Sequence, residues 1–475
     1  MRKLGDAASS RRLLHNGLGS QKLDVLRCFV QKLSHIHALP GSTGSLGSFS
    51  GLSSKPVRIV CVMFAQRDQK LCTLTPFASG RFSKPVGTFF VRGVLRLGEL
   101  RPTTNVGNKT EKTMKKTRLL CLAILAPCIS LASADHYVYT LLNQPSGNAV
   151  QTYVQGSNGK LKLVGKTSTG GLGTGQGLGS QGALAMSASG RYLFAVNAGD
   201  STVSLFAVTN GELTLLDVEK SEGESPVSVT ESDGLVYVLN QGTATTPGGI
   251  QGFANFLGEL IPISRATASV SGVGVIPVEV KFTPNGGGLV VAEKVSNLID
   301  TFQLDVRCLP RDYSYQNSYG KTPFGFDFDK KGRLFVTEAA GGASDASTVT
   351  SYSLGKNLGL TPITKSAPTN QTAACWDVVS PNGEYLYTGN AGSGNVSGFR
   401  IGANGTITLL EHSGVTGTTG GKTLDTDMSP DGEYLYVLSA INQQITTYRV
   451  AGNGSLTLID TASGLPTGTS GLVVH

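Results

Sequence analysis

One short turn recurs six times in this 475-residue chain, and a β-rich run follows each copy. Every copy ends in glycine, and from Gly190 to Gly432 successive glycines lie 44, 52, 46, 51 and 49 residues apart. Tyr192–Asn197 and Tyr434–Ser439 are typical of the runs, and Tyr137–Asn143 matches them as a seventh. A second alternating strand and a hairpin come next, which gives the four strands per unit of a β-propeller blade. The repeat therefore predicts an all-β fold, a seven-bladed β-propeller with four antiparallel strands per blade.

The hairpins and the chain ends refine this prediction. Several hairpins carry residue pairs that favour type I′ turns, because both central positions need a positive φ. The pairs are Asn158-Gly159, Asn210-Gly211, Asn404-Gly405 and Asn453-Gly454. The domain opens on a second strand, and its last residues, Gly471–His475, resemble a first strand. We therefore expect the C-terminal strand to complete the first blade, which closes the ring and removes open sheet edges.

The charge is distributed unevenly along the chain. Residues 1–113 hold 18 Lys and Arg against 5 Asp and Glu, whereas residues 135–475 hold 19 against 27. The basic part shows no zinc-finger spacing and no interleaving of aromatic and basic residues, so no nucleic-acid partner is predicted. We predict that residues 1–113 are a basic extension, either disordered or not part of the native protein.

Residues 114–134 have the pattern of a signal peptide. Met114–Arg118 is positively charged, Leu119–Leu131 is apolar, and Ala132–Ala134 is a small-residue cleavage site. Residues 135–475 are then predicted to be the propeller. We expect this mature form to be secreted or periplasmic, to have no transmembrane anchor and to be a monomer. The alternative is a real extension in which 119–131 is a buried segment or a poor anchor. Only Cys308 and Cys375 lie in the predicted mature chain, and the blade assignment argues against a disulfide between them, because it places Cys308 at an outer hairpin and Cys375 on an inner strand.

Four stretches resemble the lactonase-type seven-bladed propellers, a family that includes a bacterial 6-phosphogluconolactonase and the fungal 3-carboxymuconate cyclase. They are 389–399 (GNAGSGNVSGF), 429–436 (SPDGEYLY), Pro277–Phe302 and Thr322–Asp327. The resemblance covers 137–475 and implies lactone hydrolysis or a cyclase-like activity. The family's enzymes place His, Arg and Glu side chains around the top of the channel, and a Pro-His pair begins their innermost strands. That histidine position falls here on Gly182, Val278, Phe324, Cys375 and Leu424, with Pro226 in the remaining blade, so the channel histidines are absent.

A ring of polar residues is predicted where the seven second strands end, because these ends lie on one face of a propeller. Its members are Asn143, Asn197, Asn240, Glu293, Glu338, Asn390 and Ser439. The asparagines favour a structural role as turn caps, and Asn197, Asn240 and Asn390 are alternatively candidate ligand contacts. Glu293 and Glu338 are the candidate catalytic residues, because paired carboxylates can divide acid and base roles or bind a cation. Lys294 is a further candidate ligand contact, with a salt bridge to Glu293 as the alternative.

The innermost strands carry a second set of candidates. The acidic residues that bring negative charge to the channel are Glu279, Asp327, Asp425 and Asp427. Of these, Glu279 and Asp425 are the candidate ligands of a divalent cation. Solvated acidic side chains are the alternative interpretation, and no other cofactor is expected. Trp376 either stacks on a ligand at the channel mouth or packs between blades.

Two hypotheses about function remain open. The first is a secreted lactone hydrolase or carboxymuconate cyclase-like enzyme that uses channel carboxylates. The second is a non-catalytic secreted propeller that binds a small molecule, a glycan or a protein on its top face.

Overall fold

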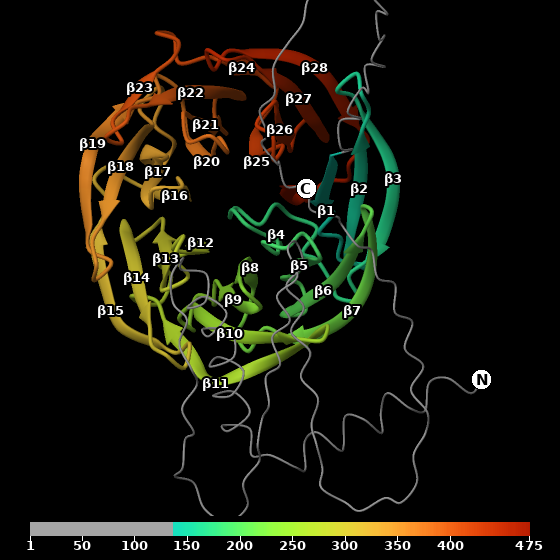
Figure 1. The fold of residues 1–475 in the computed structure, drawn as a ribbon. Coiled ribbons are helices and arrows are strands. Elements are labelled where there is room, and N and C mark those ends of the chain that lie inside the picture. Colours follow the sequence, from blue (N-terminus) through green and yellow to red (C-terminus); the bar gives the residue numbers. More distant parts are fainter. Residues whose placement is uncertain (1–135) are drawn as a thin grey trace, which may run out of the picture. The chain divides into compact units, whose positions relative to one another are not determined.

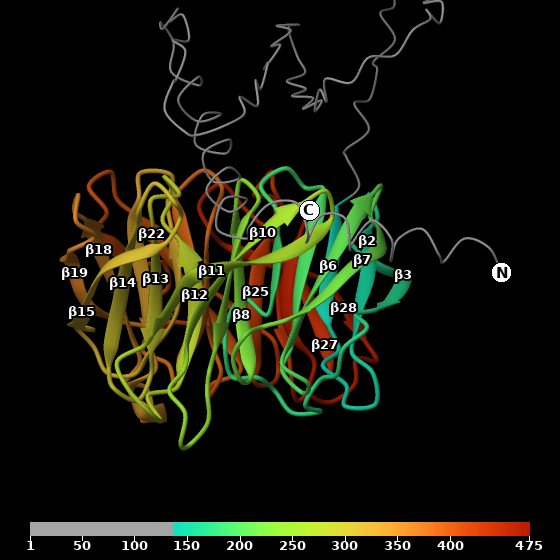
Figure 2. The ribbon, with the colours of Figure 1, turned by 90° about the horizontal axis from the view of Figure 1, so that it is seen from below.

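The computed structural model describes residues 136–475, which form seven antiparallel sheets arranged in a ring (Figure 1). Six sheets have four strands in sequence order from the centre outward, whereas the first has the order β29-β1-β2-β3; the sixth carries one additional short strand, β24 (Gly417–Thr418). In the side view of Figure 2 the strands run between the two faces of the ring. The predicted seven-bladed propeller is thus confirmed. The predicted extension and signal peptide lie outside the described residues.

The second and third strands have similar lengths in every blade, as the repeat predicts, whereas the innermost and outer strands vary, with only 3 residues in β4 and in β23. The innermost strands are β29 (Ser470–Val474), β4 (Leu184–Met186), β8 (Pro226–Ser232), β12 (Pro277–Phe282), β16 (Pro323–Phe328), β20 (Ala374–Val379) and β25 (Thr423–Met428). The second strands are β1 (Tyr137–Leu141), β5 (Tyr192–Asn197), β9 (Leu235–Asn240), β13 (Gly288–Glu293), β17 (Arg333–Glu338), β21 (Tyr385–Asn390) and β26 (Tyr434–Ser439). The third strands are β2 (Ala149–Gln155), β6 (Thr202–Thr209), β10 (Gly249–Phe256), β14 (Leu298–Leu304), β18 (Thr348–Leu354), β22 (Asn395–Ile401) and β27 (Gln444–Val450). The outer strands are β3 (Leu161–Ser168), β7 (Glu212–Lys220), β11 (Glu259–Ser269), β15 (Pro310–Asn317), β19 (Leu360–Pro368), β23 (Ile407–Leu409) and β28 (Leu456–Ser463).

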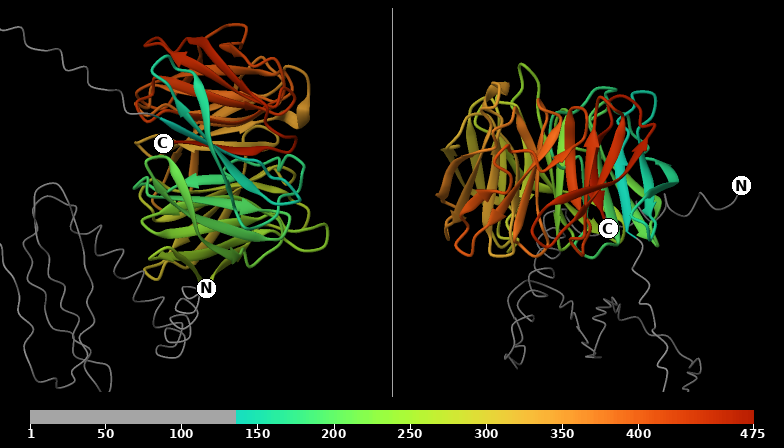
Figure 3. Two further views of the ribbon diagram at one scale, coloured as in Figure 1. Left: turned by 90° about the vertical axis from the view of Figure 1, so that its right-hand side faces the viewer. Right: turned by 90° about the horizontal axis from the view of Figure 1, so that it is seen from above.

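The ring closes as the chain ends predict. β29 pairs with β1, with Val474 opposite Val138, and the backbone N–H of Tyr137 donates to the carbonyl of His475 at 2.7 Å. Figure 3 shows the first and last parts of the propeller, in teal and red, side by side at this closure. The only helix among residues 136–475 is a 3₁₀ turn, η1 (Ala340–Gly342), and no helix there has the length and apolar character needed to cross a membrane.

The hairpin turns differ in part from the prediction. Asn210 and Gly211 both have positive φ, as a type I′ turn requires. In the other three hairpins only the glycine has a positive φ. The asparagine side chain there accepts the backbone N–H of the residue two positions later, as Asn158 Oδ1 does from Lys160 at 3.1 Å. The type I′ prediction was therefore wrong for three of the four, which form a type I turn followed by a left-handed glycine.

These glycines also make room for the neighbouring blade. A Cβ at Gly211 would lie 2.0 Å from the ring of Tyr137, and one at Gly454 would lie 2.4 Å from the ring of Tyr385. Each hairpin thus receives a large side chain from the start of the preceding blade's second strand. This contact repeats around much of the ring and helps to fix how the blades pack.

Candidate functional site

The predicted polar ring is buried. Its members are at most 4% exposed. Asn197 Nδ2 donates to the hydroxyls of Thr202 and Ser204, at 3.0 and 2.8 Å, and Asn390 Nδ2 makes equivalent bonds in its own blade. Asn240 Nδ2 donates to the carbonyl of Ser221 at 3.0 Å. The asparagines therefore tie the ends of the second strands to the next strand or to a loop. This is a structural role, but it is not the predicted capping of the following turn, because these bonds do not go to the backbone two residues on.

The two glutamates of the ring are held in the same way. Glu293 accepts hydrogen bonds from the backbone and hydroxyl of Ser271 and from the hydroxyl of Ser296. Glu338 accepts from the hydroxyl of Ser318 at 2.9 Å and from other groups of its own blade. Each carboxylate binds a separate set of loops, and both are fully buried. Their predicted catalytic role stays a prediction, but neither residue lines the cavity described below.

A short segment crosses the central channel and separates the two ends of the channel from each other. This segment, Leu178–Gly182, is named the plug here, and Figure 1 shows the chain beside β4 reaching toward the centre of the ring. The indole of Trp376 donates to the carbonyl of Ser180 at 2.8 Å. The side chain of Gln181 donates to the carbonyl of Asp377 at 3.1 Å and accepts the backbone N–H of the same residue at 3.0 Å. The plug is therefore bonded to β20 on the sixth blade, although it belongs to the connection into the second.

The channel on the upper side of the plug, where the second strands end, is apolar. Four residues at the family's histidine position, Val278, Phe324, Cys375 and Leu424, are at most 8% exposed and belong to one hydrophobic cluster. The rings of Phe324 and Trp376 pack at 4.9 Å, which favours the packing interpretation of the tryptophan. Cys375 is a free buried thiol, as expected, and burial raises its pKa to about 12.

Lys294 lies at the edge of this apolar layer. Its ammonium group is 5.6 Å from the centre of the Phe324 ring, and burial lowers its pKa. Within residues 136–475 it forms no ion pair, so the salt bridge to Glu293 that the sequence left open is not formed.

An acidic cavity of about 540 Å³ lies on the other side of the plug. Seven acidic residues line it, Glu231 and Asp233 among them, and the other five lie together with one partly exposed lysine on β12, β16, β20 and β25. The six residues on these strands are Glu279, Lys281, Asp327, Asp377, Asp425 and Asp427. The ammonium of Lys281 binds Asp327 Oδ1 at 2.6 Å. Four of these carboxyl groups are those predicted at the channel from the sequence, whereas Lys281 and Asp377 were not predicted.

Four of the five carboxyl groups bridge neighbouring blades. Glu279 accepts the backbone N–H of Phe326 at 2.7 Å, and Asp327 accepts that of Val379 at 2.8 Å. Asp425 and Asp427 both accept backbone N–H groups of β29, at 2.9 and 2.8 Å. These bonds satisfy donors on the inner edges of the sheets, which would otherwise be buried without a partner.

Asp377 is the exception. It is 1% exposed, its Oδ2 atom has no hydrogen-bond partner, and its Oδ1 atom is 3.5 Å from the amide of Gln181. Burial raises its pKa well above the usual value, and the neighbouring Asp327 and Glu279 add to the effect. This carboxyl group therefore favours its protonated form more than an exposed aspartate does.

Three other acidic groups of the cavity also hold their protons more tightly than usual. Burial raises the pKa of Glu279 to about 8, of Asp425 to about 7 and of Asp427 to about 6. Burial alone would lower the pKa of Lys281, but Asp327 and Glu279 raise it, so the lysine is charged. The cavity therefore combines one fixed cation with carboxyl groups that can release or accept protons near neutral pH. Within residues 136–475 no group of three or more His, Cys, Asp or Glu side chains is placed to hold a metal ion.

Comparison with known proteins agrees with this fold. The family model for "Lactonase, 7-bladed beta-propeller" matches residues 129–246. The chain thus resembles the lactonase-type propellers in sequence as well as in fold. No curated protein matches it in sequence.

Three solved structures of lactonase-type propellers are similar over almost their whole length. A candidate 6-phosphogluconolactonase from Bacteroides fragilis has 20% identity and a TM-score of 0.59, over 73% of this chain and 99% of its own. A second candidate, from Bacteroides uniformis, has 18% identity and a TM-score of 0.58, over 72% and 100%. The periplasmic gluconolactonase PpgL of Pseudomonas aeruginosa has 16% identity and a TM-score of 0.58, over 71% and 99%. At these identities the likeness concerns the fold.

Proposed function

We propose that this protein is a secreted hydrolase of small uncharged lactones and that the acidic cavity is its active site. The observation that carries the proposal is the set of buried carboxyl groups around one ammonium group in a cavity large enough for a sugar lactone. Titratable groups with shifted pKa values in a concave site are typical of catalysis. Secretion is proposed from the leader-like sequence at 114–134, and a periplasmic gluconolactonase of the same fold is compatible with it.

The chemistry assigns a role to three side chains. In its ionised form Glu279 removes a proton from water as the water oxygen bonds to the lactone carbonyl carbon. The carbonyl oxygen becomes an oxyanion, which the ammonium of Lys281 stabilises. When the carbonyl re-forms, the bond to the ring oxygen breaks, and the protonated Asp377 gives its proton to that oxygen. Proton exchange with solvent then restores both carboxyl groups, and the product is the open-chain hydroxy acid.

The charge of the cavity limits the substrate. A phosphorylated lactone or a carboxylated muconate would bring further negative charge beside the acidic residues that line the cavity, so we expect an uncharged substrate to be preferred. The hydroxy acid ionises once formed, and the same repulsion would favour its release.

The test compares turnover on glucono-1,5-lactone, its 6-phosphate and 3-carboxymuconate. We expect hydrolysis of the first, and a loss of kcat/KM of about 100-fold or more in Glu279→Gln and in Lys281→Met. Gln at position 279 keeps an acceptor for the N–H of Phe326, so the fold should be retained. Glu212→Gln, an exposed change on β7, is the matched control.

The same assay tests the earlier candidates, Glu293 and Glu338. If Glu293→Gln or Glu338→Gln abolishes turnover in a folded protein while Glu279→Gln does not, the active site is the polar ring and the cavity proposal is wrong. Turnover of the 6-phosphate in preference to the uncharged lactone would contradict the charge argument.

A second candidate function is a non-catalytic secreted propeller that binds a small molecule. The apolar layer of Val278, Phe324, Cys375 and Leu424 favours it, because this layer fills the place where the family's enzymes carry histidines. Saturable binding of a lactone without turnover of any of the three substrates would support this function over the first.

A further inference from the structure

A second hollow, with a volume of about 460 Å³, lies between the fourth and fifth blades and shares Thr283 and Pro284 with the acidic cavity. Its walls come from the β12–β13 turn, the β16–β17 turn and the β18–β19 hairpin. Three lysines line it, Lys330, Lys331 and Lys356, and no acidic residue does. This hollow is named the basic groove.

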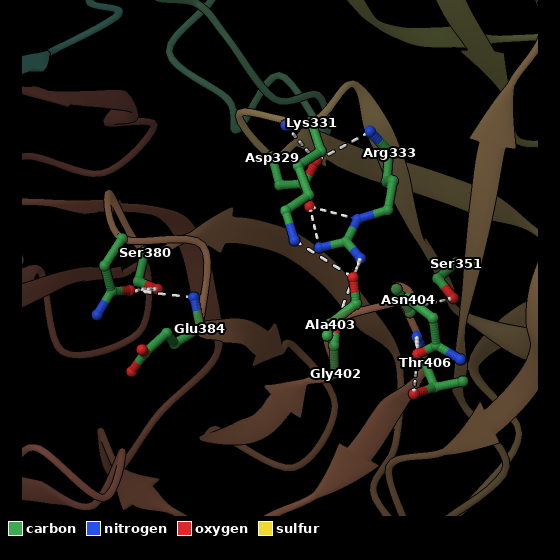
Figure 4. Close-up of polar contacts among 12 residues, drawn as sticks. Asp329, Lys331, Arg333, Ser351, Ser380, Glu384, Gly402, Ala403, Asn404 and Thr406 are labelled. Atoms are coloured by element: carbon green, nitrogen blue, oxygen red, sulfur yellow. Dashed lines mark hydrogen bonds and ion pairs between the residues drawn. The ribbon is translucent and has the colours of Figure 1, made fainter.

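The lysines of the groove are not neutralised by nearby acids. Within residues 136–475, Lys330 and Lys356 form no ion pair and no side-chain hydrogen bond, and Lys331 Nζ donates only to the carbonyl of Ala403, at 3.2 Å. Asp329, next to them in the sequence, is bound by the side chain of Arg333 and by two backbone N–H groups (Figure 4). The groove therefore keeps the charge of three lysines.

The groove lies beside a contact between blades in which the large residue and the glycine have exchanged places. At four other junctions a large side chain at the start of a second strand packs against a hairpin glycine, as Tyr137 does at Gly211. Here the second strand starts with Gly288, and Leu358 occupies the hairpin position with a positive φ of 58°. A Cβ at Gly288 would lie 2.4 Å from Leu358 Cδ1, so the leucine fills that space and forms an apolar wall of the groove. A leucine in this backbone conformation costs free energy, which is typical of sites kept for packing or binding.

Asn285 adds a neutral donor to the groove. Its Oδ1 atom is occupied by the hydroxyl of Thr283 at 2.7 Å and the N–H of Gly287 at 3.0 Å, which orients its amide. Three ammonium groups, an amide and an apolar wall match an oxyanion attached to a small organic body.

We propose that the basic groove binds a small multivalent oxyanion, a phosphate or sulfate ester, at a site separate from the acidic cavity. Residues 135–475 have 19 basic and 27 acidic residues, so the domain as a whole would repel an anion. Binding of an oxyanion would therefore depend on the local positive charge of the groove. The lysines contact the oxyanion, and Leu358 contacts the carbon skeleton that carries it.

The experiment is a calorimetric titration of the full protein with sodium pyrophosphate at fixed ionic strength, repeated with sodium sulfate and with glucose 6-phosphate. We expect saturable binding of pyrophosphate and a Kd at least about tenfold weaker in the double variant Lys330→Gln/Lys356→Gln. The matched control is Lys160→Gln/Lys162→Gln in the first blade, which removes the same charge from exposed lysines elsewhere.

The outcomes separate the alternatives. If both double variants weaken pyrophosphate binding equally, the attraction is non-specific and the proposal is wrong. Absence of binding at millimolar pyrophosphate would also overturn it. Tighter binding of glucose 6-phosphate than of pyrophosphate, lost in Leu358→Gly, would show that the apolar wall contributes. Lactone turnover is independent of this result, since none of the three proposed catalytic residues lines the groove.

Discussion

Replacing Asp300 by asparagine should stabilise this protein above about pH 6. Asp300 lies on β14 and is fully buried, and its Oδ2 atom has no hydrogen-bond partner. The hydroxyl of Tyr313 donates to its Oδ1 atom at 3.3 Å. Burial and then the neighbouring Glu293 raise the pKa of Asp300 to about 9. The blade thus contains two adjacent carboxyl groups that cannot both ionise without strong repulsion.

The size of the effect follows from linkage between proton binding and folding. The folded state keeps the Asp300 proton up to about pH 9, whereas the unfolded state loses it near pH 3.9. The contribution of this group to stability is therefore full below about pH 4 and is lost as the pH rises toward 9, by about 1.4 kcal/mol per pH unit. At pH 7 the loss has an upper limit of about 4 kcal/mol. Asparagine cannot ionise, and its amide can donate to Glu293, so we expect a net gain of about 1–2 kcal/mol after its own burial.

The measurement is urea unfolding at pH 5 and pH 8. We expect the variant to exceed the wild type at pH 8, with a smaller difference at pH 5. Asp329→Asn is the control, because the same substitution there breaks the ion pair with the nearly buried Arg333 and should destabilise the protein. If Asp300→Asn destabilises at pH 8 as Asp329→Asn does, the proton-sharing argument is refuted. Loss of lactone turnover in a stabilised Asp300→Asn would instead indicate that Glu293 and Asp300 act in catalysis.

Three further predictions follow from the packing and the cavity. Gly211→Ala should lower the free energy of unfolding, measured by urea denaturation, by about 1–3 kcal/mol, because the added Cβ would collide with Tyr137 and the φ of Gly211 is +81°. Gly464→Ala is the control: Gly464 also has a positive φ, but the space around its Cβ is open, so this substitution should cost less stability. Trp376→Phe should cost about 2–3 kcal/mol in the same assay, because it opens a gap in the core and leaves the carbonyl of Ser180 without its donor. Lactone turnover should rise with pH up to about 8, where Glu279 ionises, and a pH–rate profile flat between 6 and 9 would contradict its role as base.

The fold could be predicted because each blade carries its own local signals. The turn glycines and the strand alternation repeat with every blade, and the chain ends indicated the closing strand. The hairpin type could not be predicted from Asn-Gly alone, because the same pair at Asn158 fits a longer loop in which only the glycine needs a positive φ.

The candidate site was predictable in part. Strand alternation places the Glu279 side chain toward the channel. Because side chains two residues apart lie on the same face of a strand, the same rule also predicts Lys281 there. Gln181 could not have been found in this way. It lies in a glycine-rich connection without periodicity, and it reaches the sixth blade only because Gly325 has no side chain, since a Cβ there would lie 2.2 Å from Gln181 Oε1.

Asp377 is the residue that best separates a catalytic cavity from a structural one. Asp425 and Asp427 each accept a backbone N–H from the closing strand, so the fold needs them whether or not the cavity has a function. Asp377 Oδ2 has no such partner, and burying it costs free energy without a compensating bond. Asp377→Asn keeps an acceptor for the amide of Gln181 and should leave the urea midpoint unchanged or higher. If Asp377 is the proton donor to the ring oxygen, the variant should retain substrate binding and lose kcat by about 100-fold or more. A stabilised variant with full kcat would show that Asp377 takes no part in the chemistry, whereas a large loss of stability would show that its role is structural after all.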